Sequence, residues 1–211
     1  MEVSVESRFR LKRFAIFLSV MDLKIKPAGS VHIADLGGTL SYWKALESLL
    51  PASIANVTII NLDRQDLDAG RFQVRHGDAT DLKEYADRSF DIVHSNSVIE
   101  HVGQWREMER MAGEIHRLAP RHFIQTPNFW FPFEPHYRRP LYQFLPSQWR
   151  ASRLVKRKRG FMGPADTYVD ARSMVDTVNL LSFRDMAALF PRSIIHKEKL
   201  AGFTKSLIAV V

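Results

Sequence analysis

Four short segments of this sequence place glycines, carboxylates and hydroxyl or amide side chains directly after apolar runs. They are Asp35-Leu36-Gly37-Gly38-Thr39, Asn61-Leu62-Asp63, Gly77-Asp78-Ala79 and Ser95-Asn96. Glycines let a ligand approach the backbone closely, and an acid about 25 residues beyond them suits the hydroxyls of a ribose. Asn61 and Asp63 lie on the same side of an extended chain, so either could bind those hydroxyls. The pattern predicts a nucleoside-binding site.

Three other side chains could accept a proton from a bound substrate. His101 follows the fourth segment, and Glu134 and His136 lie together in Phe133-Glu134-Pro135-His136. A general base has to reach the proton that it removes, so these three are our catalytic candidates. Structural alternatives stay open: His101 could brace the start of a helix, and Glu134 with His136 could hold the shape of a loop. The chain has no cysteine, and we expect no metal site.

The polar segments are positioned by predicted strands that alternate with predicted helices. The strands are expected at 31–35, 57–61, 71–75, 90–94, 121–125, 193–196 and 207–211, and the helices at 7–23, 41–50, 98–119 and 182–190. Near-continuous apolar strands between helices indicate an α/β fold, with a mostly parallel sheet covered by helices on both faces. The polar segments would then lie at the carboxyl ends of the strands, where such sheets bind ligands.

The four segments, in this order and spacing, resemble class I S-adenosylmethionine-dependent methyltransferases of the small-molecule type. We compare them with the methyltransferase type 11-like enzymes and those of ubiquinone biosynthesis. The resemblance covers residues 31–128 and resumes at 202–208, which looks like the final antiparallel strand of that fold. It implies a Rossmann-like, mostly parallel seven-stranded sheet in a single domain, 1–211, with S-adenosylmethionine as cofactor.

The resemblance also implies a role for each segment. Asp35, Gly37, Gly38 and Thr39 would hold the methionine part of the cofactor, although the family usually has further glycines where Thr39 and Ser41 stand. Asn61 or Asp63 would bind the ribose. Asp78 and Ala79 would read the adenine edge, and Ser95 with Asn96 would lie beside the sulfonium.

Residues 129–165 interrupt the alternating pattern and are rich in aromatic residues, prolines and arginines. A long irregular segment in a compact domain is typically functional, so we predict a lid or substrate-recognition insertion. Eight cationic residues and no acid lie between Pro135 and Ala165, within a chain of net charge +7. Aromatic rings suit an apolar or planar acceptor, and guanidinium groups suit a phosphate or carboxylate on it.

We therefore expect methyl transfer to the oxygen of a small molecule, such as a sugar or polysaccharide intermediate or a lipid-linked or quinone-like compound. The alternatives are an RNA methyltransferase that uses the basic stretch 150–159, and a non-catalytic cofactor-binding protein. Nucleic acid is the less favoured partner, because no appended RNA-binding module is evident. The same basic stretch could contact anionic lipid. The N-terminal region 1–30 has a short apolar run that makes a poor secretory signal, so we expect an N-terminal helix and a cytoplasmic protein.

Overall fold

The computed structural model describes residues 5–20, 22, 27–63 and 65–211. The chain divides into two compact units. One contains the residues up to Ser95 together with Glu114–Phe123 and Val210–Val211, and the other contains Asn96–Gly113 and Ile124–Ala209. The predicted N-terminal region 1–30 falls partly outside the described residues, at positions 1–4, 21 and 23–26.

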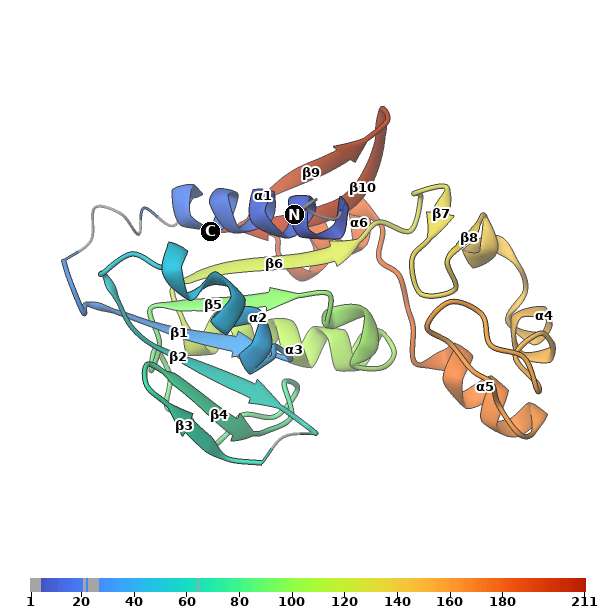
Figure 1. Cartoon of the computed structure of the whole chain (residues 1–211), viewed down its shortest axis with the longest axis horizontal. Coiled ribbons are helices and arrows are strands. Elements are labelled where there is room, and N and C mark those ends of the chain that lie inside the picture. Colours follow the sequence, from blue (N-terminus) through green and yellow to red (C-terminus); the bar gives the residue numbers. More distant parts are fainter. Residues whose placement is uncertain (1–4, 21, 23–26, 64) are drawn as a thin grey trace. The chain divides into compact units, whose positions relative to one another are not determined.

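The first unit is built on the parallel strands β1 (Val31–Leu36), β2 (Ile54–Asn61), β4 (Phe72–His76) and β5 (Ile92–Asn96). β1 pairs in parallel with β2 and with β5, and β2 pairs in parallel with β4 (Figure 1). Apolar side chains on both faces explain the near-continuous burial of β1, in which His32 alone is exposed. A three-residue edge strand that we did not predict, β3 (Leu67–Ala69), runs antiparallel to β4.

The full hydrogen-bonded strand order is β3-β4-β2-β1-β5-β6-β10-β9. β6 (Arg121–Pro127), β9 (Ile194–Leu200) and β10 (Phe203–Val210) complete it, and β5, β6 and β10 each contribute residues to both units. The amide of Val211 bonds to His122 and that of Asn128 to Lys205, so β10 runs antiparallel to β6. The prediction of a mostly parallel sheet with an antiparallel last strand is confirmed, with β3 as an additional strand.

Two helices of the first unit share one aromatic core. α1 (Val5–Val20) and α2 (Leu40–Leu46) bring Phe14, Phe17 and Trp43 together with ring centroids about 6 Å apart, and all three are buried. Trp43 meets both phenyl rings edge-to-face, which adds to the stabilisation from apolar burial. Among the described helices, none is long and apolar enough to cross a membrane.

The predicted helix 98–119 is interrupted. A short 3-10 helix, η3 (Ile99–His101), precedes α3 (Trp105–Leu118), and Gly103 between them has a φ of +131°. That backbone conformation is open to glycine and strained for other residues, so the helix restarts after it. The Glu107 carboxylate accepts the amide of Gln104 at 3.0 Å and supports the new start.

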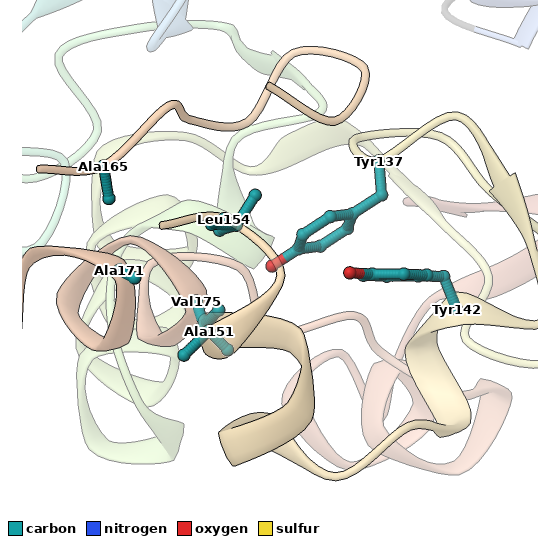
Figure 2. Packing of buried hydrophobic residues seen from close by; sticks show 7 residues of the cluster. All are labelled: Tyr137, Tyr142, Ala151, Leu154, Ala165, Ala171 and Val175. Carbon is teal, nitrogen blue, oxygen red and sulfur yellow. The ribbon is translucent and has the colours of Figure 1, made fainter. Parts of the chain in front are cut away.

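The predicted insertion 129–165 contains the hairpin β7 (Phe133–Glu134) and β8 (Arg139–Pro140), then η4 (Tyr142–Phe144) and α4 (Ser147–Ser152). α4 packs against α5 (Tyr168–Asp176), and α6 (Phe183–Leu189) follows as the last helix. Figure 2 shows a small buried cluster made entirely of residues from this part of the chain, namely Tyr137, Tyr142, Ala151, Leu154, Ala165, Ala171 and Val175. The insertion and α5 therefore form a hydrophobic core of their own.

Candidate active site

The turn after β1 is held in place by Asn61 at the end of β2. Gly37 has a φ of +72°, and its amide donates to the carbonyl of Ile60 at 2.7 Å. Asn61 Nδ2 donates to the carbonyls of Gly37 and Gly38, at 3.2 and 2.9 Å, while its Oδ1 accepts the amide of Asp63. The Asn61 amide group is therefore engaged in shaping the turn.

Asp35 lies beneath this turn rather than on its surface. Its side chain is 2% exposed, Oδ2 accepts the Trp43 Nε1 hydrogen at 2.6 Å, and Oδ1 lies 2.7 Å from Nδ1 of His94. A Cβ on Gly38 would stand 1.6 Å from Oδ2 of Asp35, so Gly38 provides the space that this carboxylate occupies. Because both carboxylate oxygens contact buried side chains of the protein, Asp35 supports the turn from below.

Thr39 replaces one of the expected glycines for a structural reason. It is the N-cap of α2, and its Oγ1 accepts the amide of Tyr42 at 3.3 Å and contacts Ser41 Oγ at 3.1 Å. Capping satisfies an amide that the first helical turn leaves unpaired. Gly38, Thr39 and Ser41 also line a cavity of about 450 Å³, together with Leu40, Lys44, Ile59, Gln65, Leu67 and Val74.

Two predicted carboxylates stand exposed at the same sheet edge. Asp63 follows β2, and Asp78 follows β4, whose parallel register pairs Asn61 with His76. Asp78 Oδ1 accepts the amide and hydroxyl of Thr80, at 2.8 and 2.9 Å, which orients the side chain. Ala79 beside it is buried. Both carboxylates are exposed, as their predicted roles in nucleoside binding require.

Ser95 and Asn96 end β5. Ser95 is fully buried, and its hydroxyl donates to the carbonyl of Leu36 at 3.0 Å, which ties the end of β5 to the end of β1. Asn96 is half-buried and is the first residue of the second unit. The predicted cofactor residues Asp35, Gly37, Gly38, Thr39, Asn61, Asp63, Asp78, Ala79 and Ser95 thus fall in the first unit.

The three catalytic candidates are brought together in the second unit. Nδ1 of His136 lies 2.8 Å from Oε1 of Glu134, and Nε2 of His136 lies 3.1 Å from Nε2 of His101. Nδ1 of His101 lies 3.2 Å from the carbonyl oxygen of Thr177. Glu134 is almost fully buried, and its Oε2 accepts the amide of Tyr137 at 2.5 Å. A continuous chain of contacts therefore runs from Thr177 through two imidazoles to a buried carboxylate.

The backbone around these imidazoles is fixed from both sides. Asn179 donates its amide to the carbonyl of Glu100 at 2.8 Å and its side-chain Nδ2 to Gly103 at 2.9 Å, which clamps η3. The carbonyl of His136 accepts the amide of Phe161 at 2.8 Å. A Cβ on Gly160 would lie 2.5 Å from that carbonyl, so only glycine permits this close approach.

The sequence indicated His101, His136 and Glu134 as candidates but not Glu100, whose carboxylate lies near both imidazoles. The Glu100 side chain is fully buried, and Oε2 accepts the Thr126 hydroxyl at 2.9 Å. Desolvation lowers the pKa of His101, and the neighbouring His136 lowers it further, against smaller opposing effects of the Thr177 carbonyl and Glu134. The signal for Glu100 was an acid inside the otherwise apolar stretch Val98-Ile99, directly before the histidine.

A second cavity, of about 850 Å³, lies in the same unit. Aromatic side chains of Phe129, Trp130 and Phe183 line it together with the cations Arg184 and Lys197, and Leu180, Ser182 and Asp185 complete the lining. Lys197 Nζ stands 4.7 Å from the centre of the Phe183 ring. Trp130 is 65% exposed, so part of the aromatic surface is open to solvent. The lining suits a partly apolar ligand with an anionic group.

A methyltransferase-domain family model matches residues 37–121, which span the turn, the ends of β2, β4 and β5, and α3. Residues 37–121 are thus a methyltransferase domain, and the chain is an S-adenosylmethionine-dependent methyltransferase enzyme. The resemblance inferred from the four segments is confirmed, and S-adenosylmethionine is the cofactor of this methyltransferase. None of the curated protein sequences matches the chain.

Solved structures share the fold at low sequence identity. A Rhodobacter sphaeroides protein described as a zinc-dependent alcohol dehydrogenase is 16% identical, with a TM-score of 0.53 over 93% of this chain and 86% of that one. A proposed methyltransferase from an antibiotic biosynthesis pathway of Anabaena variabilis is 16% identical, with a TM-score of 0.50 over 90% and 68%. A proposed O-methyltransferase from Nostoc punctiforme is 13% identical, with a TM-score of 0.53 over 98% and 57%. At these sequence identities, the structural similarities are evidence for the fold alone.

The residues at the sheet edge fit this cofactor. Gly37 and Gly38 carry no side chains that would block a ligand at the turn, and the exposed carboxylates of Asp63 and Asp78 would be acceptors for ribose hydroxyls and an adenine amino group. Because the Asn61 amide already bonds the turn and the Asp63 backbone, Asp63 is the better placed of the two for the ribose. The individual roles of these residues stay predictions.

Proposed function

We propose that the methyltransferase methylates a hydroxyl oxygen of a small molecule. The observation that carries the proposal is the contact chain from His101 through His136 to the buried Glu134, since a hydroxyl acceptor has to lose its proton for the reaction. S-adenosylmethionine supplies an electrophilic methyl group on a sulfonium. The acceptor oxygen gains the methyl carbon as the carbon–sulfur bond breaks, the electron pair of that bond stays on sulfur, and the hydroxyl proton passes to an imidazole of the His101–His136 pair.

The cavity lined by Phe129, Trp130 and Phe183 supports an acceptor with an apolar or planar body. Arg184 and Lys197 on the same lining favour a phosphate or carboxylate on that acceptor. A sugar intermediate, a lipid-linked compound or a quinone-like compound that carries an anion would meet both requirements. The basic stretch 150–159 is a separate candidate for contact with an anionic partner; there Arg153 lies over the exposed Trp149 ring at 5.8 Å.

Product formation with hydroxyl acceptors tests this proposal. The natural protein, S-adenosylmethionine and a panel of phenols, quinols and nucleotide sugars, each with and without an anionic group, would be assayed for S-adenosylhomocysteine release. NMR of the product should show a methyl ether. We expect the His101→Ala/His136→Ala double variant to lose turnover by at least about a hundredfold, within the range that acid–base assistance supplies. His32→Ala, at an exposed histidine on β1, is the matched control and should keep full activity.

Acceptor selection gives a second readout. Arg184→Ala and Lys197→Ala should raise KM for the anionic acceptors and leave the uncharged ones unchanged. Methylation of nitrogen or carbon only, or turnover with RNA that falls steeply with salt, would contradict the proposal. An unchanged rate in the double histidine variant would remove its central support.

A further inference from the structure

We propose that Glu100, His101 and His136 bind one divalent transition-metal ion. These three side chains each offer one ligand atom, and the three atoms lie within 4.8 Å of one another. All three belong to the same compact unit, with Glu100 and His101 on η3 and His136 in the insertion. Two imidazoles and one carboxylate make a donor set that zinc and other late transition metals bind well. The sequence alone predicted no metal here.

Hydrogen bonding decides which nitrogen of each ring carries a proton. The Thr177 carbonyl can only accept, so Nδ1 of His101, 3.2 Å away, is the protonated nitrogen of that ring. The Glu134 carboxylate accepts the Tyr137 amide and faces Nδ1 of His136 at 2.8 Å, so this Nδ1 also donates. In the neutral rings both Nε2 atoms then carry lone pairs, and they face each other at 3.1 Å. Two acceptors at this distance require a cation between them.

The spacing suits a metal ion better than a shared proton. Two nitrogens bound to one tetrahedral ion at about 2.0–2.1 Å lie about 3.3 Å apart, close to the observed 3.1 Å. A proton would serve the two nitrogens only. A metal ion would also use the carboxylate of Glu100, which is fully buried beside them and is oriented by the Thr126 hydroxyl at 2.9 Å.

The contacts behind the two rings have the pattern of metal-binding histidines. Such a histidine typically donates its second ring hydrogen to a carboxylate or a backbone carbonyl, which fixes the ring and makes the ligating nitrogen more basic. His136 has Glu134 in this position and His101 has Thr177. Glu134 is thus assigned as a positioning residue, which holds the His136 ring through Nδ1 while Nε2 binds the ion.

Three protein ligands leave a tetrahedral ion with one position for an oxygen ligand. A hydroxyl bound there ionises near neutral pH, since a bound zinc ion lowers the pKa of a coordinated water to about 7. With both Nε2 atoms bound to the ion, the hydroxyl proton would pass to solvent instead of to an imidazole, and the acceptor oxygen would then take the methyl group. This activating role rests on the proposed function, whereas binding of the ion does not.

Calorimetric titration of the chelator-treated, full-length protein with Zn²⁺ tests the site. We expect one equivalent to bind, with Mg²⁺ binding far more weakly because it prefers oxygen ligands. His101→Ala and His136→Ala should each weaken Zn²⁺ binding by more than about a hundredfold, and Glu134→Gln by about 10–100-fold. Co²⁺ in place of Zn²⁺ should give the intense visible absorption of a tetrahedral site. Circular dichroism melting would establish that each variant is folded.

His32→Ala and Glu107→Gln are matched controls, since neither residue belongs to the cluster, and both should bind Zn²⁺ as the natural protein does. If the folded natural protein binds no Zn²⁺, or if both histidine variants bind as tightly as the control variants, the site is refuted. Glu100→Gln is the less direct variant because the residue is buried, so the exposed His101 carries the decisive substitution.

Methyl transfer separates this inference from the proposed function. Methyl ether formation that persists in excess chelator would refute the activating role of the ion and leave O-methylation standing. Stoichiometric Zn²⁺ binding without methylation of any hydroxyl acceptor would refute the proposed function and leave the metal site standing.

Discussion

His94 and Asp35 face each other across neighbouring strands, with Nδ1 of the histidine 2.7 Å from Oδ1 of the carboxylate and both side chains 2% exposed. The parallel register of β1 and β5 pairs the two residues directly. Trp43 donates to the second carboxylate oxygen, so one buried acid connects β1, β5 and α2. The glycine turn that begins the cofactor site sits above this connection.

Replacing Asp35 by asparagine should destabilise the fold strongly. Trp43 Nε1–H and His94 Nδ1–H each use one oxygen of the carboxylate, whereas an asparagine amide has only one acceptor oxygen. One of the two buried N–H groups would therefore face the new NH₂ group, which cannot accept a hydrogen bond. We expect the free energy of unfolding to fall by about 3 kcal/mol, measured by urea denaturation. Asp68→Asn, which breaks the exposed ion pair with Arg75, should change it by less than about 1 kcal/mol. Equal losses in the two variants would contradict this account.

Cofactor affinity should depend on the two exposed carboxylates. Asp63→Asn and Asp78→Asn should each weaken S-adenosylhomocysteine binding by about 10–100-fold, because each removes a charged hydrogen-bond acceptor. Calorimetry gives the affinity, and Asp87→Asn at an exposed turn residue is the control. Full affinity in the Asp63 variant would contradict the assignment of the ribose to Asp63.

Gly38 should be intolerant of even one methyl group. A Cβ at this position would lie 1.6 Å from Oδ2 of Asp35, so Gly38→Ala forces the buried carboxylate or the turn to move. We expect a lower melting temperature and weaker S-adenosylhomocysteine binding. At Gly113, inside α3, a Cβ would meet nothing within 4 Å, and Gly113→Ala should stabilise by about 0.5–1 kcal/mol. A stable Gly38→Ala variant with full affinity would show that the carboxylate is dispensable.

His122 should make the protein sensitive to acid. Burial, and secondarily the nearby His116, lower the pKa of His122 to about 4, from its ordinary 6.5. Because the folded protein holds this proton less tightly than the unfolded chain does, stability is complete above pH 6.5 and is lost as the pH falls toward 4. The loss should reach about 3 kcal/mol. Urea denaturation at several pH values measures it, and His122→Phe should flatten the dependence between pH 6.5 and 4; an unchanged slope in that variant would assign the effect elsewhere.

Much of the sheet could be predicted because its strands carry near-continuous apolar runs that end in glycines or acids. β3 could not be predicted because three residues are too few to show the alternating apolar pattern of a strand. The first of them, Leu67, is also exposed. The break before α3 could not be predicted because the helical apolar pattern continues across Gly103. The φ of +131° at this glycine cannot be recognised from the pattern of residue types.

The residue types of the candidate site could be chosen from the sequence, but their hydrogen-bond partners could not. An acid and a histidine inside two apolar strands, Asp35 and His94, could have been matched only after the strand order was known. His101 and His136 are joined through an insertion that has no periodicity, so their 3.1 Å contact depends on the hairpin and on Gly160 rather than on spacing. Conversely, Asn61 was an open alternative for the ribose, and its bonds to the turn explain why an amide stands there.

The small core of Tyr137, Leu154, Ala171 and their neighbours has a consequence for mutational tolerance. Residues between 137 and 175 pack against one another. We therefore expect substitutions there to change the stability of this small core and to leave that of the parallel sheet unchanged. A mutational library confined to exposed positions of this segment, such as Trp149 and Phe161, should yield mostly folded proteins. The fraction of folded members would measure how much sequence change this separate core tolerates.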